Sequence, residues 1–212
     1  EVLTRLGGLC KMAFSDYKHI SQVQTEFNIR LEEQNFIVAD ELQPPDSYLE
    51  DLAFNMENID VYSSEASRSE LLISPTLREV YKGYYKRYAF WIQRHFSYND
   101  TLSDVPDYMF ATKSPLGKTV LATPIIVLVE AKRSDFEQGW GQCLAELVAA
   151  QKVNNDVEFP VYGIVTNGEL WKFGKLVGDT FTMHIEGYTI VQIAKLFGAI
   201  NFLLHSADKA GK

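Results

Sequence analysis

The chain lacks several features that would place it in particular classes of protein. It has two cysteines, Cys10 and Cys143, which form neither a zinc-binding pattern nor a disulfide framework. Its longest aliphatic run is the five residues 125–129, so no segment is long enough to predict a membrane span. The N-terminus shows no basic segment followed by a long apolar one, so no secretory signal is expected. These absences indicate a protein of the reducing cytoplasm with no membrane partner.

Common nucleotide-binding and nucleophile motifs are also missing. The chain contains no G-x-x-x-x-G-K-[ST] loop, no G-x-G-x-x-G loop and no G-x-S-x-G elbow. The histidines are scattered, and each is expected to be a packed or surface residue: His19, His95, His184 and His205. We therefore expect neither a phosphate-binding loop of these types nor a serine-hydrolase site.

Positive charge is absent from one stretch of the chain. Between Asp40 and Glu65 there are eight acidic residues and no Lys or Arg. The whole chain has 28 acidic and 20 basic residues, a net charge of −8, so removing these eight leaves 20 of each. The acidic surplus therefore lies in one segment, and the rest of the chain is balanced.

What is present indicates one globular domain, or a domain with an appendage. The chain has 212 residues, of which 46% are hydrophobic and 13% aromatic, enough for a sizeable core. Residues 16–34 carry apolar side chains at helical spacing, which predicts an amphipathic helix. Pro44 and Pro45 break the chain, and Ser47 with Glu50 predicts a capping box that opens a short helix. We assign residues 1–63 to an N-terminal helical extension that contains the acidic segment, and 64–212 to an α/β core.

The core is predicted to begin with a long helix over residues 64–86, kinked at Pro75. Its buried stripe is formed by Leu77, Tyr81, Tyr84 and Tyr88. Beside that stripe lies a basic row, which consists of Arg78, Lys82 and Lys86. Basic residues interleaved with tyrosines suit a phosphate backbone, but they equally suit long stems that cover a core with their charged ends in water.

Strands and one helix follow. Strands are predicted over residues 90–98 and 105–111, with a turn at Asn99 and Asp100, and a central strand over 124–132. Ser134 and Glu137 form a possible capping box for a helix that continues to about residue 152. Gly139 and Gly141 in its first turns cost roughly 1 kcal/mol each relative to Ala, which suggests a close approach to the sheet.

The C-terminal part completes a mixed sheet. A strand over 161–166, the hairpin signal Asn167-Gly168 and a return strand over 169–176 come first. A strand over 180–185 and a final helix that begins near Thr189 follow. The order predicts the α/β class, a mixed β-sheet flanked by helices, with extra N-terminal helices before it.

The end of the central strand carries opposite charges. Five aliphatic residues are followed by Glu130, Ala131 and Lys132, and strand alternation places Glu130 and Lys132 on one face with Ala131 on the other. Charges at the end of so apolar a strand are costly unless they are paired, hydrated or bound to a metal. An ordinary ion pair at a solvated strand end is the simplest interpretation of these three residues taken alone.

Together with other residues, this tripeptide resembles a family signature. Pro106-Asp107 and Glu130-Ala131-Lys132 match the motif of the PD-(D/E)XK nuclease superfamily, with Glu70 on an earlier helix and Gln142 on a later one. Residues 160–168 also resemble the nuclease segment of type I restriction subunits. The resemblance covers about residues 64–186 and implies a restriction-endonuclease-like fold and metal-dependent phosphodiester hydrolysis on nucleic acid, with DNA preferred over RNA and a homodimer as one arrangement.

The resemblance also implies roles for individual residues. Asp107, Glu130 and the carbonyl of Ala131 would hold Mg²⁺ or Mn²⁺, and hard divalent cations prefer such oxygen ligands. Lys132 would position the attacking water and stabilise the transition state. Glu70, or Glu65 in its place, would contact the metal through water. Gln142 would orient Lys132 or the water. The expected nucleic-acid contacts are Arg78, Lys82, Lys86 and Arg133.

Alternatives stay open at this stage. Glu70 is equally explained as the capping-box partner of Ser67, and Gln142 as a solvated helix residue. The acidic segment is either a solvated connector or a phosphate mimic that competes for the nucleic-acid-binding face. A non-catalytic module with the same fold, acting in a nucleic-acid or protein complex, is the main functional alternative, and an enzyme of another class is the third.

Overall fold

The five-aliphatic run lies in the central strand of the protein, β6 (Ile125–Ala131), in a computed structural model that describes residues 13–99 and 102–210. Every residue of this strand is buried. Burial on both faces explains why its sequence is a continuous apolar run rather than an alternating one. Cys10 and Asp100 lie outside the described residues.

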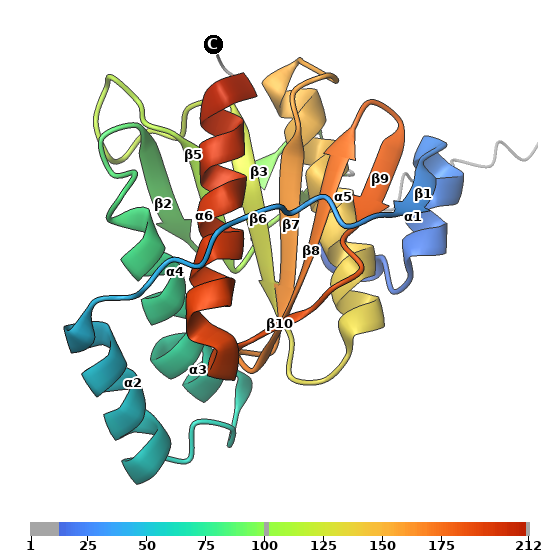
Figure 1. The fold of residues 1–212 in the computed structure, drawn as a ribbon. Helices are drawn as coiled ribbons and strands as arrows, with labels where there is room; N and C mark the ends of the chain where they lie inside the picture. The colour runs from blue at the N-terminus through green and yellow to red at the C-terminus, as the bar shows by residue number, and fades with distance from the viewer. Residues whose placement is uncertain (1–12, 100–101, 211–212) are drawn as a thin grey trace, which may run out of the picture.

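The strands form one large mixed sheet with the order β1-β9-β8-β7-β6-β5-β2 (Figure 1). On one side of β6 the antiparallel strands are β5 (Tyr108–Thr112) and β2 (Tyr88–Ile92). On the other side β7 (Val161–Thr166) runs parallel to β6. The outer strands are β8 (Leu170–Val177), β9 (Thr180–Met183), β10 (Tyr188–Thr189) and β1 (Arg30–Glu33), while β3 (Phe96–Ser97) and β4 (Ser103–Asp104) pair separately.

Helices cover both faces of the sheet (Figure 1). The crossover helix α5 (Phe136–Asn154) packs on one face, with α1 (Ile20–Phe27) against its outer side. The C-terminal helix α6 (Ile193–Ala210) packs on the other face beside α4 (Ser74–Tyr81). Each face has its own cluster of buried apolar residues. The predicted α/β class, a mixed sheet flanked by helices, is confirmed.

The helix predicted over residues 16–34 is wrong in its second half. After the short helix η1 (Phe14–Asp16), α1 ends at Phe27 and is followed by Asn28, whose φ of 55° is left-handed. The next residues form the edge strand β1, which pairs in parallel with β9. The helical spacing predicted that Leu31 lies on the buried face of the helix, yet this residue is 42% exposed. Pairing with a distant strand outweighs the local helical spacing here, so residues before 64 contribute a strand as well as helices.

The helix predicted over residues 64–86 begins at its predicted start and ends early. Ser64 Oγ accepts a hydrogen bond from the Ser67 amide at 3.0 Å and caps α3 (Glu65–Arg68). A π-helical segment, η2 (Ser69–Ile73), then joins α3 to α4, which ends at Tyr81. Pro75 has no amide hydrogen to donate within the helix, and the widened turn directly precedes it in place of the predicted simple kink.

Several other boundaries also differ from the predictions. Helix α2 (Asp46–Asn58) begins one residue before Ser47, after Pro45, and shows no side-chain cap bond. The strand predicted over residues 105–111 begins only at Tyr108, after Pro106 and Asp107. The C-terminal strands lie where predicted within two residues, and Gly168 in their hairpin has a φ of 85°.

Residues 190–209 form one stretch of helix long and apolar enough to cross a membrane, with mean hydropathy 1.4. Half of this stretch is buried inside the protein. It comprises η3 (Ile190–Gln192) and most of α6, whose apolar side chains belong to the cluster on one face of the sheet. A core helix of a water-soluble domain has the same length and composition, so this feature alone says nothing about location.

Candidate metal and catalytic site

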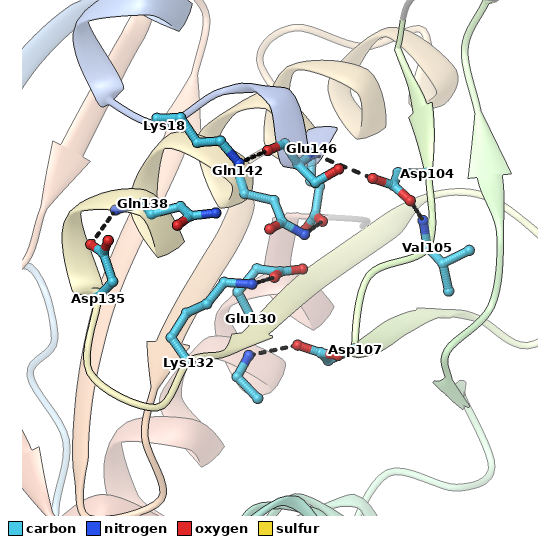
Figure 2. A network of polar contacts seen from close by, with 12 residues as sticks. Lys18, Asp104, Val105, Asp107, Glu130, Lys132, Asp135, Gln138, Gln142 and Glu146 are labelled. Carbon is cyan, nitrogen blue, oxygen red and sulfur yellow. Dashed lines mark hydrogen bonds and ion pairs between the residues drawn. The ribbon is translucent and has the colours of Figure 1, made fainter. Parts of the chain in front are cut away.

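The charged end of β6 lies under the first turns of α5 (Figure 2). Glu130 and Lys132 lie on the α5 face of the sheet, whereas Ala131 belongs to the cluster on the opposite face. Glu130 is 1% exposed, and its Oε2 lies 3.1 Å from Lys132 Nζ. Strand alternation thus places the acid and the amine side by side, as the sequence pattern predicted.

Asp107 reaches the same place from the neighbouring strand. It directly precedes β5, which is antiparallel to β6, and its Oδ2 accepts a hydrogen bond of 2.8 Å from the Ala131 amide. The N–H and C=O of one strand residue project toward the same neighbouring strand, so the Ala131 carbonyl also faces the β5 side. Two carboxylates and one backbone carbonyl therefore surround the end of β6.

Helix α5 is held close above this site by a glycine. A Cβ on Gly139 would lie 2.7 Å from Val165 Cγ1 and 3.0 Å from Lys132 Cγ, so a larger residue would push the helix off the sheet. Gly141 approaches a different neighbour, because a Cβ there would lie 2.7 Å from the Tyr17 carbonyl oxygen. The predicted approach to the sheet thus holds for Gly139, while Gly141 accommodates the N-terminal segment.

The helix cap differs from the predicted one. Asp135, not Ser134, caps α5, and its Oδ1 accepts a hydrogen bond of 2.9 Å from the Gln138 amide. The cap lies one residue later than the Ser134–Glu137 pattern indicated. The helix begins at Phe136, and this start places Gln142 on the face that looks toward β6.

Gln142 contacts a residue that the sequence analysis missed. Its Nε2 donates a hydrogen bond of 3.4 Å to Glu146 Oε1, and Glu146 is 0% exposed (Figure 2). Gln142 itself is buried, which contradicts the solvated alternative. Glu146 could have been found from its spacing, because it lies four residues after Gln142 and so on the same side of the helix.

Burial raises the pKa of all three carboxyl groups. For Asp107 burial is the main cause, partly offset by the Ala131 amide and Lys132. Burial, and then the Asp107 charge, raise the pKa of Glu130 to about 7, whereas Glu146 and Lys132 act to lower it. Burial and the Glu130 and Asp107 charges raise the pKa of Glu146 well above its ordinary value. Like charges confined in an apolar setting disfavour the ionised form, and such groups gather at functional sites.

The pKa of Lys132 is also raised, but for Lys132 this favours the charged form. Burial acts to lower its pKa, but the charges of Glu130, Asp107 and Glu65 outweigh burial, and the pKa of Lys132 is raised. The side chain therefore carries a positive charge at neutral pH. A charged ammonium cannot accept a proton from water, so this arrangement favours a positioning and charge-stabilising role over that of a general base.

Glu65 and Glu70 lie at the entrance to this site. Both are exposed, and both line a cavity of about 250 Å³ together with Asp107. The charge of Glu65 acts to raise the pKa values of Asp107 and Lys132, whereas the charge of Glu70 acts to raise the pKa of Tyr108. The capping box considered for Ser67 and Glu70 is absent, because Ser67 lies inside α3.

The predicted nucleic-acid contacts are not gathered around this site. Arg78 and Lys82 line a separate cavity of about 310 Å³ between α2 and α4, and Lys82 Nζ lies 2.6 Å from Glu79 Oε2. Lys86 is exposed over the ring of Tyr85. Arg133 is exposed and directly follows Lys132. Arg133 is therefore the member of this set that lies next to the carboxylates along the chain.

The donor set limits which cations fit. Within residues 13–99 and 102–210, no group of three or more His, Cys, Asp or Glu side chains is placed to hold a metal ion. Asp107, Glu130 and the Ala131 carbonyl would leave most coordination positions to water, as Mg²⁺ and Mn²⁺ accept and Zn²⁺ structural sites do not. Both Glu130 oxygens are buried: Oε2 faces the Lys132 ammonium at 3.1 Å, and Oε1 accepts no hydrogen bond within the described residues, which suits a cation.

No protein-family model matches the chain, and no curated protein matches its sequence at a significant level. Functional interpretation therefore depends on the geometry of the residues described above.

Proposed function

We propose that the protein is a metal-dependent nuclease that hydrolyses phosphodiester bonds in nucleic acid, DNA in preference to RNA. The observation that carries this proposal is the meeting of Asp107, Glu130 and Lys132 at one end of two adjacent strands. An acid from each strand and an amine beside them form the constellation that the PD-(D/E)XK resemblance predicts. We also propose that the sheet is of the restriction-endonuclease-like type, since both motifs lie at this end of it.

The residues divide the chemistry between them. Asp107, Glu130 and the Ala131 carbonyl would hold Mg²⁺ or Mn²⁺, which when bound polarises the phosphoryl oxygen and lowers the pKa of a coordinated water. Lys132, held charged by its acidic neighbours, would orient the attacking water and offset negative charge that grows on the phosphorus oxygens. Glu65 or Glu70 would contact the metal through water from the mouth of the site, and Arg133 would contact the substrate backbone.

Plasmid cleavage tests this function directly. Wild-type protein should nick or linearise supercoiled plasmid with Mg²⁺ or Mn²⁺ but not with EDTA. Asp107→Ala and Lys132→Ala should lose this activity, whereas Asp179→Ala, in the exposed turn between β8 and β9 at the opposite end of the sheet, should retain it. Equal cleavage by all four proteins would show that the site described here is not responsible.

A second candidate function is favoured by the charge distribution. The eight uncompensated acids between Asp40 and Glu65 suit a protein-binding module better than a surface that surrounds DNA. On this alternative the fold is kept and serves in a nucleic-acid or protein complex without catalysis. Mn²⁺ binding with no cleavage of duplex or single-stranded substrates would support it over the nuclease.

A further inference from the structure

Glu146 is the most deeply buried acidic residue near the site, and neither the proposed metal ligands nor Lys132 includes it. It lies in the middle of α5, and its side chain is 0% exposed. Its neighbours on that helix, Leu144, Leu147 and Val148, are apolar residues of the sheet-facing cluster. A carboxyl group in this position needs an explanation, because burying it costs several kcal/mol more than a Leu or Met of similar size.

Its contacts point into the site rather than into the scaffold. One oxygen, Oε1, accepts the hydrogen bond from the Gln142 amide, and the carboxyl group lies close enough to Glu130 for each of the two groups to affect the pKa of the other. The other oxygen, Oε2, is buried with no hydrogen-bond donor in the described part of the chain. Figure 2 shows Gln142 and Glu146 projecting from α5 over the end of β6 that carries Glu130 and Lys132.

The contacts of Glu130 show why a partner on this side matters. Lys132 Nζ lies 3.1 Å from one oxygen of the Glu130 carboxyl group, and the buried Glu146 carboxyl group is the neighbour of Glu130 on the α5 side. A metal-binding carboxylate is usually oriented by an outer partner, and loss of that partner typically costs about 10–100-fold in metal affinity or activity. Gln142, which the resemblance assigned to Lys132 or the water, instead donates to Glu146.

We propose that Glu146 is a positioning residue of this site: from α5 it holds the Glu130 carboxyl group and the Gln142 amide in the orientation that a divalent cation requires. The proposal rests on the proposed metal-dependent function and adds a residue to it. Glu146 itself need not contact the cation or the substrate. Its effect should therefore appear in metal affinity and in the choice between Mg²⁺ and Mn²⁺, rather than in folding.

Two substitutions separate orientation from packing. Glu146→Gln keeps the shape, can donate an N–H to Glu130 and can accept the bond from Gln142. Glu146→Met fills the same volume with neither contact. We expect Glu146→Gln to keep Mn²⁺ affinity, measured by calorimetry on the full chain, within about twofold, and Glu146→Met to weaken it about tenfold or more. Rescue by Gln is a result that a purely structural role would not produce.

The controls distinguish failure of this inference from failure of the proposed function. Glu137→Gln changes an exposed glutamate on the same helix, beside His19, and should bind Mn²⁺ as the wild type does. Circular dichroism should show that all variants are folded. Unchanged affinity in Glu146→Met, or an equal loss in both Glu146 variants, would overturn the positioning role while leaving the metal site intact. A wild-type protein that binds no Mn²⁺ would overturn the metal site and this inference together.

Discussion

The two faces of the central sheet bury different kinds of side chain, although the same strands form both. On the α6 face β6 contributes Ile126, Val129 and Ala131 to a cluster of aliphatic and aromatic residues. On the α5 face the strand ends in Glu130, and both carboxylates that are buried in the described part of the chain, Glu130 and Glu146, lie there. The apolar side chains of the α6 face are explained by the stability that their burial provides. The buried carboxyl groups of the α5 face oppose folding, which indicates that they serve a function.

The largest expected effect comes from placing a charge on the wrong face. Val129→Asp would bury a carboxylate among apolar side chains of the α6 face, where Val129 is 0% exposed. An uncompensated buried charge destabilises by about 3–5 kcal/mol. Urea unfolding followed by circular dichroism measures this loss. Val191→Asp, at an apolar position that is 85% exposed, is the control and should change little. A loss under about 1 kcal/mol for Val129→Asp would contradict the distinction between the faces.

Substitution of the adjacent residue, Glu130, should reduce activity and leave stability intact. Glu130→Gln removes a proposed metal ligand and a buried charge at once. We expect Mn²⁺-dependent plasmid cleavage to fall at least about 100-fold. Resistance to urea should change little, because burial raises the pKa of Glu130 to about 7 and its ionisation therefore opposes folding, which offsets the lost contact with Lys132. Glu158→Gln, an exposed acid that precedes the start of β7, should leave both properties unchanged. Full cleavage activity in Glu130→Gln would remove this residue from the catalytic set.

Titration of the buried acids gives the third effect. The pKa of Glu146 in the folded protein lies well above the ordinary Glu value of 4.5, because of burial and the nearby Glu130 charge. Between those two values the folded state binds more protons than the unfolded state, so stability falls as pH rises, by up to about 1.4 kcal/mol per pH unit for one proton. Below about pH 4.5 both states are protonated at this residue and its contribution no longer changes.

The measurement is the slope of unfolding free energy against pH. Urea unfolding of the wild type between pH 5 and 8 should show stability decreasing with pH, and Glu146→Gln should flatten that slope because it cannot ionise. Glu137→Gln, whose carboxyl is exposed, should retain the wild-type slope. If Glu146→Gln has the wild-type slope, the pH dependence of stability does not come from a proton bound by Glu146.

The elements that the sequence predicted well are those whose burial leaves a local signature. The runs at β6 and β7 are apolar because both faces are covered, and Asn167-Gly168 specifies its turn through a positive φ. Edge strand β1 has no such signature. Its four residues are all exposed, and its pairing is with β9, about 150 residues further along the chain. Pairing at that distance cannot be predicted from local periodicity.

The candidate site divides in the same way. The alternation that brings Glu130 beside Lys132 and the Pro106-Asp107 pair at the start of the next strand are local features, and the structure brings these residues together, although that strand begins at Tyr108 and not at residue 105. The partner of Gln142 depended on the rotation of α5 above the sheet. That rotation is set by two close approaches of the helix. Gly139 lies against Val165 of β7, and Gly141 lies against Tyr17 and His19 of the N-terminal segment. The four-residue spacing places Glu146 on the same side of α5 as Gln142, but that this side faces Glu130 depends on the rotation of the helix.

The smallest expected effect concerns where nucleic acid lies. Arg133 follows Lys132 at the α5-face site, whereas Arg78 lies on α4, which packs on the α6 face, and Lys82 directly follows that helix. Lys82 is already paired with Glu79, and Arg78 shares its cavity with Asp51. We therefore expect Arg133→Ala to weaken binding to a labelled DNA duplex severalfold. The slope of log binding constant against log salt concentration should fall by about 1, as expected for the loss of one phosphate contact.

Arg78→Ala is the matched variant and should change binding by less than twofold, roughly the scale of an exposed ion pair. Fluorescence anisotropy at several salt concentrations, with EDTA present to prevent cleavage, measures both variants under the same conditions. A larger loss in Arg78→Ala would place the nucleic acid over α4 and beside the acidic helix α2. The acidic segment would then lie next to the bound backbone, where its repulsion could oppose binding, and deleting it should tighten that binding.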